Sequence, residues 1–76
     1  MKIIYSDHAK QNMVERRISS KEVESTILNP EKLIDSKKGR MIAQKTIGNR
    51  LLRVIYKETE KVYIIVTFYY TKVGRY

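Results

Sequence analysis

The chain has 76 residues, enough for one small domain with a limited core. It contains no cysteine, which excludes disulfides, a cysteine nucleophile and a thiolate metal site. Because it has a single histidine, a metal site formed by one chain is not expected, and no cofactor is predicted. The longest apolar run, residues 62–70, is shorter than the roughly 20 residues of a membrane-spanning helix. The first residues show no signal segment. We therefore expect a single cytoplasmic domain, residues 1–76, without a membrane partner.

The excess positive charge is confined to the second half of the sequence. Residues 1–35 carry six basic and six acidic side chains, whereas residues 36–76 carry ten basic and two acidic ones, so the net charge of +8 arises after residue 35. A one-sided cationic field attracts polyanions, because phosphates that become paired with lysine or arginine release their counterions. This charge distribution favours RNA as a ligand. The alternative is a solvated basic surface that only keeps the protein soluble.

The N-terminal half predicts one short strand followed by two helices. Residues 2–5 form a β-branched run typical of an edge strand. Ser6 is placed to cap a helix that stops near Arg17. A second helix is expected to begin at the capping box Ser19-Ser20-Lys21-Glu22 and to end at Asn29-Pro30, because the residue before a proline disfavours the helical conformation.

From residue 32 onward the apolar residues alternate with a period of two, which indicates strands. The expected strands are "KLID", "MIAQKTI", "RLLRVIYKE" and "KVYIIVTFYY", joined by turns at "SKKGR", Gly48-Asn49 and Thr59-Glu60. The predicted order is β-α-α-β-β-β-β. We expect an α+β fold in which the two N-terminal helices pack on one face of a twisted antiparallel sheet.

Alternation also predicts which face of the sheet each strand residue occupies. In the last strand, we expect the helices to cover Val62, Ile64, Val66 and Phe68. In the strand before it, the same face holds Leu52, Val54 and Tyr56. The opposite face then presents Arg53, Lys57, Tyr63, Thr67 and Tyr69, joined by Lys45 if its register matches. Two helices cannot cover both faces, so we expect this second face to stay open and to suit RNA, since cations hold phosphates and aromatic rings stack on bases.

Several motifs resemble a family of short prokaryotic proteins known only as a domain of unknown function. The stretches that carry the resemblance are "SDHAKQNMVERRISSKEVESTILNP", "IGNRLLRVIYKE" and "VYIIVTFYY", which cover nearly the whole chain. The family's motif positions fall on His8-Ala9, Met13, Glu15-Arg16, and Thr67 with Tyr69 or Tyr70. The family usually has an arginine before the methionine, where this chain has Asn12, so a phosphate contact from that position is not carried over.

The resemblance implies more than the residue pattern does. In its order of elements the family is similar to the RelE/ParE and BrnT toxins and, more distantly, to barnase-like ribonucleases. This implies a compact RelE-like domain, toxin-like and sometimes part of a toxin–antitoxin pair. ParE-like members of this broad group act without cutting RNA, so whether the protein is an enzyme stays open.

Metal-free RNA cleavage requires a base, an acid and cations, and the sequence offers candidates for each. His8 is the acid–base candidate, because histidine titrates near neutral pH. Arg16, Arg53 and Tyr69 complete the candidate catalytic set, with Tyr70 as the alternative tyrosine. The candidate nucleic-acid-binding residues are Lys45, Arg50, Arg53, Lys57 and Thr67. Each also has a structural interpretation: His8 as a capping or packing residue, Arg16 as a partner of its neighbours, and the tyrosines as packing residues of a strand.

Two function classes follow. The first is a toxin-like, metal-independent endoribonuclease, and the second is a non-catalytic RNA- or protein-binding module on the same fold. A third interpretation is a basic face that serves an acidic antitoxin-like protein. The edge strand at residues 2–5 could pair with a second copy, so a monomer and a homodimer both stay open.

Overall fold

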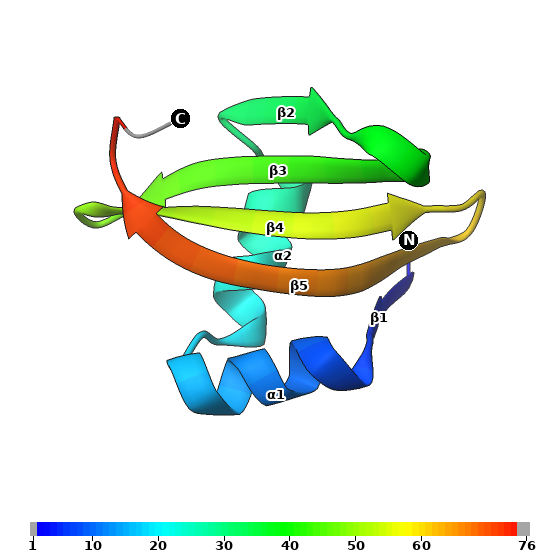
Figure 1. Cartoon of the computed structure of the whole chain (residues 1–76), viewed down its shortest axis with the longest axis horizontal. Helices are drawn as coiled ribbons and strands as arrows, with labels where there is room; N and C mark the ends of the chain where they lie inside the picture. Colours follow the sequence, from blue (N-terminus) through cyan, green and yellow to red (C-terminus); the bar gives the residue numbers. More distant parts are fainter. Residues whose placement is uncertain (1, 75–76) are drawn as a thin grey trace.

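The computed structural model describes residues 2–74, which form an α+β fold, as predicted (Figure 1). The helices are α1 (Asp7–Arg16) and α2 (Ser20–Leu28). The strands are β1 (Lys2–Tyr5), β2 (Lys32–Asp35), β3 (Arg40–Ile47), β4 (Arg50–Glu58) and β5 (Val62–Lys72), with a short 3₁₀ turn, η1 (Lys37–Gly39), between β2 and β3. The predicted order of elements is confirmed.

The five strands form one sheet in the order β1-β5-β4-β3-β2. Strands β2 to β5 are an antiparallel meander, as expected, and β1 is an edge strand. However, β1 lies parallel to β5, so the sheet is mixed and the prediction of an antiparallel sheet is wrong. Parallel pairing needs a long connection, which here is the whole chain between β1 and β5.

Both helices begin and end where the local sequence predicts. The Ser6 side chain accepts a hydrogen bond from the Ala9 N–H, and Arg17 ends α1 in the left-handed conformation with φ of 53°. In α2, Ser19 and Glu22 form the predicted capping box, and Asn29 is the C-cap residue. Within residues 2–74, neither helix is long and apolar enough to cross a membrane.

The two helices occupy different positions relative to the sheet. In Figure 1, α2 lies behind β3 and β4, whereas α1 lies along β5. Ala9 of α1 is fully buried in the core, and Ser6 donates a hydrogen bond to the Val66 carbonyl of β5. The expectation that both helices pack on one face is therefore only half right: α2 covers the face, and α1 covers the free edge of β5 beyond the end of β1.

A β-bulge in β5 changes the predicted face assignment. Ile55 pairs with Thr67 and Tyr56 pairs with Ile65, which leaves Val66 as an extra residue. Because the bulge shifts the alternation by one position, Ile65 and Phe68 both face α2, together with Tyr63. The predicted assignment is right for Phe68 and wrong for Val62 and Ile64, while Val66 is the extra residue of the bulge. The buried core is Ala9, Ile18, Val23, Ile27, Ala43, Leu52, Val54, Tyr56, Ile65 and Phe68.

Candidate nucleic-acid interface

The face of the sheet opposite α2, here called the outer face, carries cations and no acids at its strand positions within residues 2–74. The strand register and the alternation of side chains assign its residues. From β2 to β4 they are Lys32, Ile34, Arg40, Ile42, Gln44, Thr46, Leu51, Arg53, Ile55 and Lys57. From β5 they include Ile64, Thr67, Tyr69 and Thr71, and from β1 Ile4. These positions make the face basic, as expected, but the expectation that it stays open is wrong at its centre, where Gln44, Leu51 and Arg53 are buried.

Arg53 lies at the centre of the outer face and is held by two polar neighbours. Its Nε donates to the Gln44 Oε1 at 3.1 Å, and its Nη1 donates to the Tyr69 hydroxyl at 2.8 Å. The guanidinium carbon also lies 5.9 Å from the centre of the Tyr69 ring. Only 8% of Arg53 is exposed, so it is not the freely solvated cation that the sequence suggests. The structure instead presents an arginine in a fixed orientation.

The border between α1 and the outer face is set by one hydrogen bond. Asn12, 2% exposed, donates from Nδ2 to the Thr67 Oγ1 at 2.6 Å. His8 and Arg16 lie four residues before and after Asn12, so all three start from the same side of α1. His8 and Arg16 are exposed, and about 12 Å of helix axis separates them. The predicted residues His8 and Arg16 therefore lie on the side of α1 that carries Asn12, whose partner Thr67 is two positions from Tyr69 on β5.

Two predicted nucleic-acid-binding residues lie on the other face of the sheet. Lys45 pairs with Leu52 and donates from Nζ to the Ser25 hydroxyl of α2 at 2.8 Å. Its register therefore does not match that of Arg53, which was the condition for Lys45 to join the outer face. Arg50 also faces the helix side, where its guanidinium lies 4.0 Å from the centre of the Tyr70 ring. The reason is the register: Lys45 and Arg50 both share the face of Leu52, whereas Arg53 is one position out of phase with it.

The other tyrosines of the C-terminal strand also belong to the helix side. Tyr63, expected on the outer face, packs edge-to-face against Tyr56, with ring centres 5.4 Å apart. Tyr70 donates a hydrogen bond to Glu22, which is also the acidic residue of the α2 capping box. Burial and this hydrogen bond raise the pKa of Tyr70 to about 12, and the same hydrogen bond lowers the pKa of Glu22. Of the two candidate tyrosines, Tyr69 lies on the outer face, while Tyr70 holds the sheet to α2.

Sequence reasoning missed two residues of this site, Gln44 and Asn12. Gln44 is 4% exposed and binds Arg53, which is nine positions away along the chain. The available signal was its place in "MIAQKTI", where alternation puts a glutamine on the same face as Arg53 once the Gly48-Asn49 hairpin fixes the register. Asn12 gave no such signal, because its partner Thr67 lies 55 positions away.

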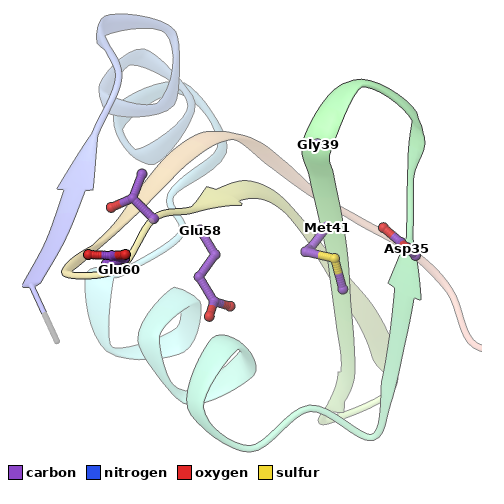
Figure 2. A pocket seen from close by; sticks show the side chains of 6 residues that line it. Asp35, Gly39, Met41, Glu58 and Glu60 are labelled. Carbon is purple, nitrogen blue, oxygen red and sulfur yellow. The ribbon is translucent and has the colours of Figure 1, made fainter.

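One hollow on the surface lies away from the outer face and is acidic. It measures about 730 Å³ and is lined by Asp35, Gly39, Met41, Glu58, Thr59 and Glu60 (Figure 2). Because its three carboxylates repel phosphates, this hollow does not suit a polyanion. Within the described residues 2–74, no group of three or more histidine, aspartate or glutamate side chains is placed to hold a metal ion.

Comparison with known proteins gives one match. The family model described as a domain of unknown function (DUF4258) matches residues 5–70, which include every element from α1 to β4 and most of β5. No curated protein and no solved structure matches the chain.

Proposed function

The chain belongs to the DUF4258 family, and because that description assigns no function, we propose one from the geometry: the protein binds RNA through its outer face. The observation that carries this proposal is the oriented Arg53 at the centre of a face without strand acids. A guanidinium held by Gln44 and Tyr69 loses little conformational freedom when it binds a phosphate. Lys32, Arg40 and Lys57 lie on the same face: Lys32 pairs with Gln44, and Lys57, four positions along β4 from Arg53, pairs with Arg40.

The proposal includes a RelE-like fold and a toxin-like role in the cytoplasm. It is supported by the order β-α-α-β-β-β-β, which agrees with the order expected from the resemblance to RelE/ParE and BrnT toxins. The net charge of +8 supports a polyanionic ligand, and an acidic antitoxin-like protein would find the same cations. We choose RNA because the face also carries the Tyr69 ring beside its cations, and an aromatic ring can stack on a base.

Titration of a labelled RNA oligonucleotide at several salt concentrations tests the proposal. The double variant Lys32→Ala/Lys57→Ala removes two exposed cations of the outer face, and Lys21→Ala/Lys72→Ala removes two exposed cations elsewhere. We expect the first variant to bind more weakly and to lower the slope of log affinity against log salt by about 1.4, which is about 0.7 per phosphate contact on single strands. Equal effects of the two variants would contradict the proposal.

Metal-independent cleavage of the bound RNA is a second candidate function, favoured by the side of α1 that His8 shares with Asn12 and Arg16. In such a reaction, His8 takes the proton of a ribose 2′-hydroxyl as its oxygen attacks the phosphorus. The bond from phosphorus to the 5′-oxygen then breaks, and that oxygen receives a proton from the Tyr69 hydroxyl, which regains one from solvent. The products are a cyclic 2′,3′-phosphate and a 5′-hydroxyl. Arg53 and Arg16 stabilise the charge that develops on the phosphate oxygens.

Incubation of the purified protein with total RNA in the presence of a chelator separates cleavage from binding. If the protein is a nuclease, His8→Ala abolishes cleavage and leaves RNA affinity within twofold of wild type. Lys10→Ala, a change at another exposed position of α1, leaves both unchanged. RNA that stays intact while it binds tightly would reject the nuclease and leave the binding module. Expression of an active nuclease in cells would slow growth, and His8→Ala would relieve the effect.

A further inference from the structure

Two parallel rows of side chains cross the strands of the outer face. The polar row consists of Lys32, Gln44, Arg53 and Tyr69, which are register partners on β2, β3, β4 and β5. The isoleucine row consists of Ile34, Ile42 and Ile55, which are partners on β2, β3 and β4, and it continues into Thr67 of β5. The two rows are adjacent because their residues are two positions apart along each strand. The outer face therefore combines one line of polar side chains with one line of apolar groups. In the polar line, Lys32 is exposed and Tyr69 is partly buried, whereas Gln44 and Arg53 are buried.

The isoleucine row distinguishes between paired and unpaired RNA. All three isoleucines are only partly buried, and among residues 2–74 no helix packs over them. A double helix turns phosphates and sugars outward, so it would cover these side chains with polar groups and gain no apolar contact. Unpaired bases can be splayed out and can lay their apolar faces on the protein. The isoleucines thus favour a single strand.

The charges of the face argue against a second copy of the chain as its occupant. Two outer faces brought together would place the exposed Lys32 and Lys57 of one copy near the same cations of the other. Like charges at short range repel, and this repulsion is not offset by any acid at the strand positions of the face within residues 2–74. An occupant of opposite charge, with apolar surfaces spaced along a flexible backbone, fits both rows.

We propose that the RNA bound by this protein is single-stranded and crosses the strands, with its backbone over the polar row and its bases over the isoleucine row. This rests on the proposed function, whose ligand class it narrows. The polar row spans roughly 14 Å, since neighbouring strands lie about 4.8 Å apart. Beyond Tyr69, the path reaches the side of α1 that carries Arg16. The bound segment is therefore short, comparable to the about four nucleotides at the lower end of single-strand sites on small folds.

Strand β2 offers a matched pair of variants for the test. Ile34 belongs to the isoleucine row, and Leu33 is its neighbour on the same edge strand but faces the helix side and is 51% exposed. Fluorescence anisotropy compares an unstructured eight-nucleotide RNA with the same strand annealed to its complement, with a chelator present. We expect wild-type protein to bind the single strand at least tenfold more tightly than the duplex. Ile34→Ser then lowers affinity for the single strand about fivefold, and Leu33→Ser lowers it less than twofold.

The outcomes separate this inference from the proposed function. Equal or tighter binding of the duplex, or equal effects of Ile34→Ser and Leu33→Ser, would overturn the single-strand inference while RNA binding stands. A protein that binds neither RNA would overturn both. Truncation of the strand from eight to two nucleotides adds a check on the footprint: affinity should fall steeply only below about four. A continuous decline from eight nucleotides downward would contradict the short path across the sheet.

Discussion

The two faces of the sheet differ in what their polar residues do. On the helix side, polar groups join elements to one another: Lys45 binds Ser25, and Tyr70 binds Glu22. On the outer face, Arg53 donates hydrogen bonds to two neighbours within the sheet, Gln44 and Tyr69. The helix side also carries the acidic hollow of Figure 2, whereas the outer face has no acid at its described strand positions. The comparison shows that a cation's position in the sequence does not reveal its role, since Arg50 and Arg53 lie three residues apart on opposite faces.

Two residues of β4 that lie on opposite faces of the sheet test the difference in packing, and they give the largest expected effect. Leu52 is fully buried on the helix side, and Ile55 is only partly buried on the outer face. Leu52→Ala should lower the free energy of unfolding by about 3 kcal/mol, because it leaves a cavity in the core, whereas Ile55→Ala should cost about 1 kcal/mol. Urea unfolding compares the two. A cost for Ile55→Ala equal to that of Leu52→Ala would mean that the outer face is packed rather than open.

Two arginines on opposite faces test the difference in ligand contact. We expect Arg53→Gln to weaken RNA binding at least tenfold, or about 1.4 kcal/mol, and Arg50→Gln to change it less than threefold. Anisotropy titration at fixed salt measures both, with circular dichroism as the control for folding. Because Arg53 is largely buried, Tyr69→Phe provides a milder variant that removes only the hydroxyl that accepts from Arg53. Affinity unaffected by both Arg53→Gln and Tyr69→Phe would move the site off the outer face.

The smallest effect concerns pH and the helix side. The hydrogen bond from Tyr70 and the capping box keep the pKa of Glu22 below its ordinary value, so the ionised carboxylate stabilises the fold. This stabilisation is present above the unfolded pKa near 4.5 and is lost as pH falls through the lower folded value. Glu22→Ala should therefore cost about 1 kcal/mol at pH 7 and less at pH 3. Melting temperatures at both pH values measure the effect, and a constant difference between variant and wild type would contradict it.

Much of the fold could be predicted because the signals are local. Ser6, the capping box from Ser19 and the Gly48-Asn49 hairpin each act within a few residues, and all three lie where the sequence places them. The candidate site was predicted in part. Arg53, Thr67 and Tyr69 share the outer face, as alternation indicates, whereas Lys45 and Tyr63 do not, because one register and one bulge decide their faces.

The sequence by itself determined the order of the elements, the ends of both helices and the separation of charge along the chain, since these depend on neighbouring residues and on composition. The tertiary structure alone decided that β1 runs parallel to β5, that α1 covers the β5 edge and that Asn12 meets Thr67. Only the folded chain also fixes the orientation of Arg53 between Gln44 and Tyr69. The physical reason is distance along the chain: these contacts join residues that become neighbours only when the core excludes water and the strands pair.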